Sequence, residues 1–140
     1  GGGGGGGGGR GGGGGGAPAA ERVAILDWDV HHGNGVAAIF ADNPQVRYCS
    51  LHEAGGFPGS GADESDGGPG GNVLNLPLPK GSGSEDYLTA LKEKALPFLL
   101  GSDGADGEAP TVLLVCAGYD AMEAVSACER ERVSSDDVAS

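Results

Sequence analysis

Residues 23–35 read Val-Ala-Ile-Leu-Asp-Trp-Asp-Val-His-His-Gly-Asn-Gly, and this stretch decides the predicted fold. Its apolar start is typical of a buried strand, and the polar residues and glycines after it indicate a loop at the strand's carboxyl end. Asp27, Asp29 and His31 are spaced by two residues. If the strand conformation persists through them, their side chains point to one side. The stretch therefore predicts a buried strand that ends in a cluster of polar side chains.

The polar cluster has the composition of a metal site. Two neighbouring carboxylates repel each other, and burial without a cation would raise their pKa values until one became neutral. A divalent metal keeps both ionised and takes a neutral imidazole as a further ligand. Asp120 follows another apolar run, so a parallel sheet would bring it to the same edge as Asp29 and His31. One nitrogen and two carboxylates suit zinc or ferrous iron and leave positions open for water and substrate.

Spacing alone leaves another interpretation of this cluster open. Asp27 and Asp29 would then be caps or surface charges, and His31 and His32 would be loop histidines with ordinary hydrogen-bond partners. A calcium loop is excluded, because the twelfth position counted from Asp27 is Ala38 rather than glutamate.

The rest of the chain alternates between short apolar runs and helical patterns. This alternation predicts a parallel, doubly wound α/β sheet, in which sites lie beyond the carboxyl ends of the strands. Because a central parallel sheet needs helices on both faces, we expect these residues to form only part of such a sheet. The predicted strands are Arg22–Trp28, Val46–Leu51, Asn72–Leu78 and Thr111–Cys116, and the predicted helices are Val36–Ala41 and Ser84–Leu100.

The longer predicted helix has recognisable ends. Ser84 is expected to cap its first turn, where Glu85 and Asp86 suit the positive end of the helix dipole. Pro97 is expected to kink or end the helix, because proline lacks an N–H and its ring collides with the preceding turn.

The beginning of the chain differs in composition from the rest. Residues 1–16 are glycine apart from Arg10, and unbroken glycine buries no apolar surface that would offset its backbone entropy. We therefore expect residues 1–20 to form a disordered leader and residues 21–140 to form a partial domain.

Charge and composition exclude several classes of protein. The net charge is −12 and the Lys and Arg residues are scattered, which argues against direct binding to nucleic acid. An acidic surface tolerates a cationic partner such as a lysine-rich tail or a polyamine. Neither a targeting peptide nor an apolar run of about 20 residues is present, so we expect no membrane partner and an intracellular location, in the nucleus or the cytoplasm. The three cysteines, Cys49, Cys116 and Cys128, are widely spaced, so we expect buried free thiols.

Residues 23–35 resemble the metal-binding signature of the histone deacetylase and acetylpolyamine amidohydrolase family, in its class II-like spelling. Four further motifs follow in the family's order. They are Ser50-Leu51-His52, Phe57-Pro-Gly-Ser-Gly61, Asn75-Leu-Pro-Leu78 and Ala117-Gly-Tyr-Asp-Ala121. The resemblance runs from about Ala19 to the end of the chain and implies an arginase/deacetylase-like fold, with residues 21–140 a partial histone deacetylase-type domain.

The resemblance implies two metal sites. It identifies Asp29, His31 and Asp120 as ligands of a catalytic zinc ion. It also implies a structural potassium ion near the zinc, held by positions that match Asp27, Ser50 and Leu51.

Other residues take roles by the same resemblance. Asp27 lies where the family orients a catalytic histidine, and Asn34 occupies a position just outside the zinc ligands. Phe57 matches an aromatic wall of the tunnel that admits an acylated lysine. His32 and His52 match no catalytic base and are expected to be structural.

The implied reaction is hydrolysis of acetyl-lysine, in histones or other proteins, to lysine and acetate. The family takes its basic histidine pair from a segment upstream, where this chain has polyglycine, and its oxyanion-binding tyrosine from a loop beyond Ser140. The resemblance therefore implies an incomplete catalytic set. The alternatives are an acetylpolyamine or other small-amide hydrolase, a catalytically inactive metal-binding protein, and a related arginase-like site with paired manganese. The last predicts a second set of aspartate ligands, which the sequence does not provide.

Overall fold

The computed structural model describes residue 1 and residues 21–63, 69–102 and 109–121. The predicted disorder of the leader and the predicted thiol Cys128 lie outside these residues. Four parallel strands form one sheet in the order β3-β2-β1-β4. The strands are β1 (Val23–Asp27), β2 (Val46–Glu53), β3 (Val73–Leu78) and β4 (Val112–Cys116). The predicted partial, parallel α/β sheet is therefore confirmed.

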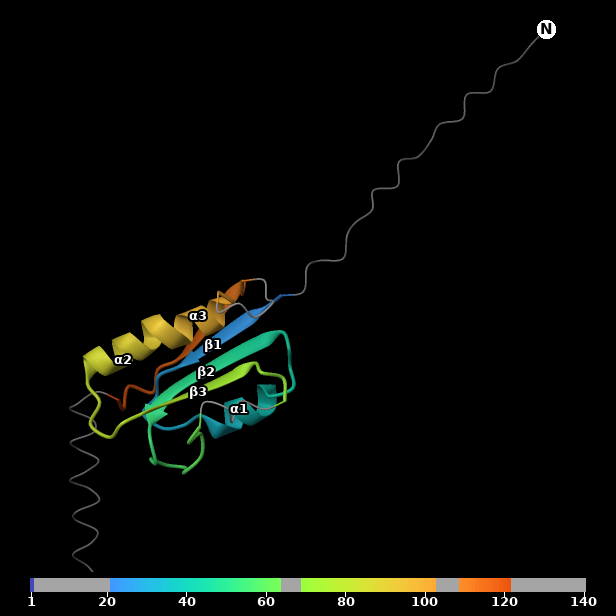
Figure 1. Cartoon of the computed structure of the whole chain (residues 1–140). Helices are drawn as coiled ribbons and strands as arrows, with labels where there is room; N and C mark the ends of the chain where they lie inside the picture. Colours follow the sequence, from blue (N-terminus) through green and yellow to red (C-terminus); the bar gives the residue numbers. More distant parts are fainter. Residues whose placement is uncertain (2–20, 64–68, 103–108, 122–140) are drawn as a thin grey trace, which may run out of the picture.

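Helices cover both faces of the sheet, as Figure 1 shows. On one face lies a continuous helical stretch made of α2 (Ser84–Ala90), η1 (Leu91–Ala95) and α3 (Leu96–Leu100). On the other face lies the short helix α1 (Asn34–Phe40). The helices α1 and α2–α3 thus lie in connections that cross over opposite faces of the sheet.

Alternate residues of the strands build two separate cores. Successive side chains of a strand point to opposite faces, so Ala24 and Leu26 face the long helical stretch while Ile25 faces α1. The first core contains Ala24, Leu26, Cys49, Leu51, Leu76, Ala95 and Leu99, and the second contains Ile25, Val46, Tyr48 and Val73. The two cores fix β1 in the sheet. Two of the candidate metal ligands, Asp29 and His31, follow directly after β1 and are positioned by it.

Strand β4 is covered less completely than the other strands. Its residues Val112, Leu113, Leu114 and Val115 are 39%, 53%, 51% and 45% exposed, whereas Ala24 beside them in β1 is fully buried. This exposure agrees with the expectation that the chain forms only part of a sheet whose two faces are covered by helices.

The long helical stretch has the predicted bounds, Ser84–Leu100, but its cap and the effect of Pro97 differ from the prediction. Ser84 is the first helical residue rather than the cap, which is Gly83, and the Gly83 N–H donates to Asp86 Oδ2 at 2.9 Å. The stretch reaches its predicted end at Leu100, so Pro97 does not end it. A π turn, η1, directly precedes α3, and its wider hydrogen-bond pattern accommodates a residue that lacks an N–H. Pro97 thus changes the helix type without ending the helix.

Two of the predicted free thiols can be placed. Cys49 is buried and free, as expected, and burial raises its pKa to about 12. Cys116 is free but only partly buried, and burial also raises its pKa.

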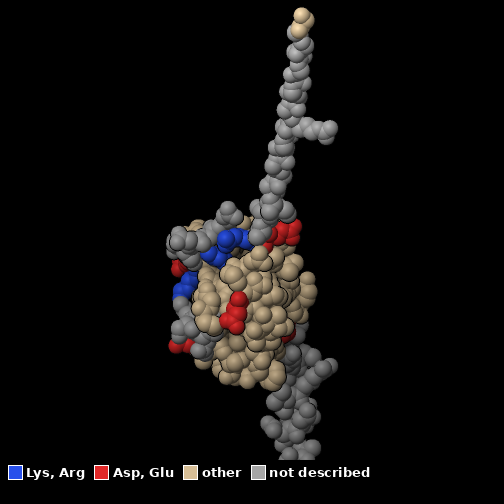
Figure 2. Space-filling view, turned by 90° about the vertical axis from the view of Figure 1, so that its right-hand side faces the viewer, with Lys and Arg blue, Asp and Glu red and all other residues tan. Residues whose placement is uncertain are grey.

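Two further findings concern the charged side chains on one face of the molecule and the length of its helices. Figure 2 shows a mostly uncharged face on which the coloured basic and acidic side chains form small separate groups. No helix in the described part of the chain is both long and apolar enough to cross a bilayer.

Asn72 closes the connection between α1 and β2. Its side chain is 6% exposed, and Nδ2 lies 2.6 Å from the Phe40 carbonyl oxygen, 3.0 Å from that of Asn43 and 2.9 Å from that of Val46. Two amide hydrogens therefore serve three backbone oxygens. This side chain joins the end of α1, the following turn and the start of β2.

Replacing Asn72 by alanine is expected to lower the free energy of unfolding by about 1–3 kcal/mol, because buried carbonyl groups lose a donor. Urea denaturation measures the loss. Asn72→Asp is the matched control, since it keeps the shape but puts a second acceptor opposite the carbonyl oxygens. If the Asn72→Asp variant were as stable as the wild type, the donor role would be contradicted.

Candidate metal centre

The three predicted zinc ligands lie together beyond the carboxyl ends of β1 and β4. One ligand atom from each of Asp29, His31 and Asp120 lies within 4.8 Å of the other two. His31 Nδ1 is 2.8 Å from Asp120 Oδ2 and 3.2 Å from Asp29 Oδ1. Strands β1 and β4 are adjacent and parallel, with Asp27 beside Cys116. The loops that follow therefore start at the same edge of the sheet, although Asp29 and Asp120 are far apart in sequence.

Backbone N–H groups orient both carboxylates of the cluster. Asp120 Oδ1 accepts a hydrogen bond from the Val30 N–H at 3.1 Å, and Asp29 Oδ1 accepts one from the His31 N–H at 2.8 Å. Contacts of this kind hold metal ligands in position before a metal binds. The residues present therefore fit a divalent metal with one nitrogen and two carboxylate ligands.

A strained turn precedes Asp120. Gly118 has φ 55° and Tyr119 has φ 68°, both in the left-handed region. The Tyr119 N–H also donates to the nearby Ala117 carbonyl, which closes a tight turn. Non-glycine residues enter this region at a cost, and such residues concentrate at functional sites. The turn brings Asp120 back toward Asp29.

Asp27 is more deeply buried than the cluster and has protein partners for both oxygens. It is 3% exposed; Oδ1 accepts the Asp29 N–H at 3.1 Å and Oδ2 accepts the Tyr48 hydroxyl at 2.8 Å. Burial raises the pKa of Asp27, while these two hydrogen bonds oppose the rise. Burial also raises the pKa of Tyr48, so its hydroxyl keeps the proton that it donates.

The expected potassium ligands lie beside Asp27 on β2. The Ser50 side chain is fully buried, and Ser50 Oγ lies 2.9 Å from His52 Nδ1. The oxygens of Asp27 and Ser50 thus have hydrogen-bond partners within the protein. Leu51 is 1% exposed and belongs to the first core. The potassium site stays a prediction.

Phe57 stands beside the cluster on an exposed loop. Its side chain is 77% exposed, and its ring meets the His31 imidazole edge-on at a centroid distance of 6.1 Å. Buried histidines anchor this loop: His32 Nδ1 lies 2.8 Å from Ser60 Oγ, and His52 Nε2 lies 2.9 Å from the Gly61 carbonyl oxygen. Both histidines are buried, consistent with the structural role expected for them. Their contacts keep the loop that carries Phe57 close to His31.

The anchoring histidine His52 predicts a pH-dependent stability. Burial lowers the pKa of His52, and the neighbouring His32 adds to this. Below pH 6.5, the ordinary pKa of histidine, His52 becomes protonated in the unfolded chain but stays neutral in the folded chain until the pH reaches its lower folded-state pKa. The stabilising contribution is therefore present above pH 6.5 and is lost as the pH falls toward the lower pKa of the folded state.

Replacing His52 by asparagine is expected to remove this contribution to the pH dependence. Unfolding free energies at about pH 7.5 and about pH 5 would measure it, because histidine is the side chain that titrates in this range. The wild type should lose more stability than His52→Asn on acidification. An identical loss in both proteins would contradict the assignment.

The sequence did not predict that Tyr48 and Gly118 lie close to the cluster. Tyr48 donates a hydrogen bond to Asp27, and Gly118 lies close to Asp29 and Asp120, but neither belongs to a pattern of ligand-type residues at regular spacing. The position of Asn34, which was predicted to lie just outside the zinc ligands, is a separate point. The exposed residue Asn34 begins α1, and its backbone N–H donates to the His32 carbonyl oxygen. The role of Asn34 beside the zinc ligands stays a prediction.

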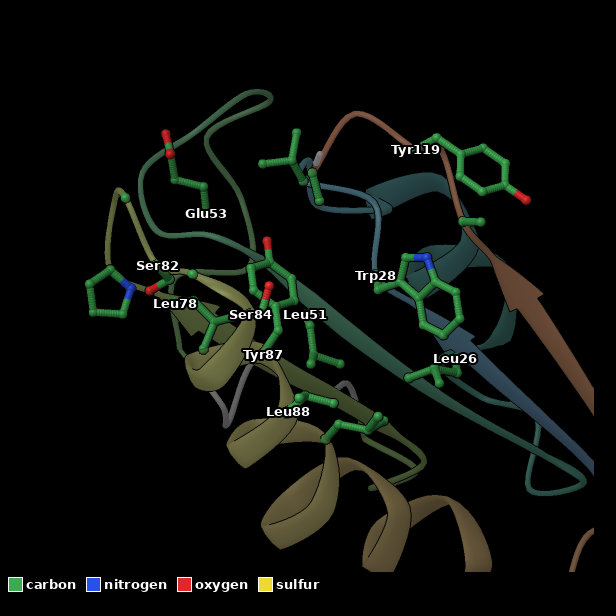
Figure 3. A pocket seen from close by; sticks show the side chains of 17 residues that line it. Leu26, Trp28, Leu51, Glu53, Leu78, Ser82, Ser84, Tyr87, Leu88 and Tyr119 are labelled. Carbon is green, nitrogen blue, oxygen red and sulfur yellow. The ribbon is translucent and has the colours of Figure 1, made fainter. Parts of the chain in front are cut away.

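A hollow of about 1010 Å³ lies beside the cluster, between α2 and the carboxyl ends of the strands. Figure 3 shows Leu26 and Trp28 on one side of it and Tyr87 and Leu88 of α2 on the other. Burial raises the pKa of Tyr87, and the negative charge of Asp120 adds to this. The lining of the hollow is therefore mixed: apolar side chains lie beside the protonated Tyr87 hydroxyl and the polar residues Glu53, Ser82 and Ser84.

The fold and the cluster together define a class. An open parallel α/β sheet with one imidazole and two carboxylates beyond its carboxyl edge is an α/β protein with a candidate metal centre of the catalytic type.

The comparisons with known proteins then identify the family. The histone deacetylase domain matches residues 17–131. A histone deacetylase-like amidohydrolase of Pseudomonas aeruginosa is 42% identical over 120 residues, which cover 83% of this chain and 30% of that protein. The chain therefore belongs to the histone deacetylase domain family.

Solved structures agree with this assignment. The structure of the histone deacetylase Clr3 matches with a TM-score of 0.64 and 37% identity, covering 76% of this chain and 18% of that one. An acetylpolyamine aminohydrolase from Burkholderia pseudomallei matches with a TM-score of 0.62 and 31% identity, covering 72% and 29%. The chain spans about a third or less of the length of the curated relatives it matches.

Proposed function

We propose that this chain supplies the metal-binding part of a zinc-dependent amidohydrolase that cleaves the acetyl-lysine amide to lysine and acetate. The observation that carries the proposal is the convergence of Asp29, His31 and Asp120, whose ligand atoms lie within 4.8 Å of one another. Membership of the histone deacetylase domain family supports the same reaction.

Zinc is the proposed metal because of the donor set. One imidazole nitrogen and two carboxylate oxygens match the three protein ligands of catalytic zinc sites. When bound, zinc would supply a polarised amide carbonyl and a bound water with a pKa near neutrality. Potassium near Asp27 and Ser50 is proposed on the resemblance alone.

The residues of the chain would prepare this site. The N–H groups of Val30 and His31 hold the two carboxylates in place before metal or substrate arrives. The exposed ring of Phe57 beside His31 offers an apolar wall for the methylene chain of an acetylated lysine. The general base and the oxyanion donor are assigned to no described residue. The described residues alone are therefore expected to bind zinc, and turnover requires a general base and an oxyanion donor in addition.

The proposed substrate is an acetylated lysine of a histone or another protein. An acetylpolyamine is the alternative, because an acetylpolyamine aminohydrolase from Burkholderia pseudomallei is also among the similar structures. Both substrates present an acetylated amine on a flexible aliphatic chain. A non-catalytic metal-binding protein is the third candidate. For the division of the chain, we propose residues 1–20 as leader and 21–140 as partial deacetylase domain; an intracellular site in the nucleus or cytoplasm stays a prediction.

A two-part experiment tests the proposal. Zinc binding is measured by calorimetric titration of the 140-residue chain. Release of acetate from an acetyl-lysine peptide and from an acetylated diamine is measured with the longest coding sequence that contains these residues. Zinc binding with metal-dependent acetate release supports the hydrolase. Binding without release by that longer protein would favour the non-catalytic candidate, and a preference for the diamine would favour the polyamine substrate.

A further inference from the structure

We propose that Tyr48 is a positioning residue for the metal centre, because one buried hydroxyl contacts both ends of the segment that carries two of the three ligands. This segment, residues 27–33, contains Asp29 and His31 and is called the ligand segment below. The inference rests on the metal site proposed above and goes beyond it by naming the side chain that holds that site in place.

The contacts of Tyr48 carry the inference. Tyr48 lies on β2 beside Ile25 of β1 and is fully buried. Its hydroxyl donates to Asp27 Oδ2 at 2.8 Å and lies 3.2 Å from the Gly33 carbonyl oxygen. The hydroxyl has one proton, so the two acceptors share it, and the shorter contact goes to the carboxylate. A residue of β2 thereby joins the beginning and the end of the ligand segment.

A chain of hydrogen bonds leads from Tyr48 to the ligands. Asp27, held by the hydroxyl, accepts the Asp29 N–H at 3.1 Å. Asp29 in turn accepts the His31 N–H at 2.8 Å. Each contact orients the next residue, so loss of the hydroxyl releases the first member of the series. Partners outside the ligands set the orientation of metal ligands in this way.

Gly33 provides a separate observation at the same point. A Cβ atom at this position would lie 2.1 Å from the Tyr48 hydroxyl oxygen and 2.5 Å from Asp27 Oδ2. The φ angle of Gly33 is −76°, which any residue adopts. Glycine is therefore required here for space, and the space is filled by the Tyr48 hydroxyl and the Asp27 carboxylate.

The first experiment removes only the hydroxyl. Tyr48→Phe keeps the ring in the second core, and its zinc affinity is measured by calorimetric titration of the 140-residue chain with zinc chloride and a competing chelator. We expect the affinity to fall by about 10- to 100-fold, the range for loss of a partner outside the ligand set. Circular dichroism of the metal-free chain checks that it folds.

A control separates positioning from stability. Val46→Ala removes volume from the same core, but Val46 pairs with Val23 at the opposite end of β1. This variant is expected to lose stability and to keep its zinc affinity. If Tyr48→Phe and Val46→Ala lowered the affinity equally, the effect would be one of stability, and the positioning role would be overturned.

A second variant tests the same contact at Gly33, the residue that lies against the Tyr48 hydroxyl, so the inference does not depend on Tyr48→Phe alone. Gly33→Ala places a methyl group against the hydroxyl and is expected to weaken zinc binding in the wild type. In the Tyr48→Phe background the additional loss should be smaller, because the hydroxyl oxygen that the methyl group would strike is gone. Fully additive losses would overturn the inference.

The outcomes distinguish this inference from the proposed function. Wild-type chain that binds zinc while Tyr48→Phe binds equally well would overturn the role of Tyr48 and leave the proposed function standing. Wild-type chain that binds no zinc would overturn the proposed metal site, and the positioning role with it.

Discussion

Replacing Asp120 by alanine is expected to lower the zinc affinity of the chain by more than about 100-fold, because loss of a ligand should exceed the 10- to 100-fold cost of losing a partner behind one. Asp120 Oδ2 lies 2.8 Å from His31 Nδ1, so its carboxylate is a central member of the cluster. Removing it leaves one carboxylate and one imidazole. Calorimetric titration with zinc chloride measures the change.

Two matched variants control for charge and shape. Asp42→Ala removes a negative charge from the exposed turn after α1 and is expected to leave the zinc affinity unchanged. Asp120→Asn keeps an oxygen that can accept from the Val30 N–H but lacks the negative charge, so its affinity should be low as well. If Asp120→Ala bound zinc as tightly as the wild type, Asp120 would not be a ligand.

Replacing Gly118 by alanine is expected to lower the zinc affinity by about 10- to 100-fold without removing any ligand. A Cβ atom on Gly118 would lie 2.0 Å from Asp29 Oδ2 and 2.9 Å from Asp120 Oδ1. Both carboxylates must move to admit it. The positive φ of 55° adds backbone strain, which is expected to lower the free energy of unfolding by about 1 kcal/mol.

Gly55→Ala separates the two effects of this substitution. Gly55 also has a positive φ, 72°, but a Cβ atom there would meet nothing within 4 Å. This control should therefore lose stability while keeping its zinc affinity. Equal zinc affinities for Gly118→Ala and Gly55→Ala would show that Gly118 does not set the position of the carboxylates.

The order of strands and helices was largely predictable from local patterns. The apolar run that ends at Asp27 and the one that ends at Cys116 form adjacent parallel strands. Strand β2 ends at Glu53, two residues beyond its prediction, and β3 begins at Val73, one residue after its prediction. Buried strands of a parallel sheet are continuous apolar runs, which are visible without knowledge of their neighbours.

The behaviour of the long helical stretch was less predictable. Proline at position 97 signals a break because its ring and missing N–H disturb a regular α-helix. The structure accommodates it with the π turn Leu91–Ala95, while Ala95 and Leu99 remain packed in the first core. Burial of this apolar face stabilises the continuous helix against the local preference of a single residue.

The sequence by itself determined which residues carry the proposed chemistry, because the spacing of Asp27, Asp29 and His31 and the motif around Asp120 are local properties of the chain. Only the tertiary structure decided which residues hold them in place. The Tyr48 hydroxyl and the close approach of Gly118 to Asp29 join residues that are distant in sequence. Such contacts depend on strand order and register, and a shift of one residue would turn each strand side chain to the opposite face of the sheet.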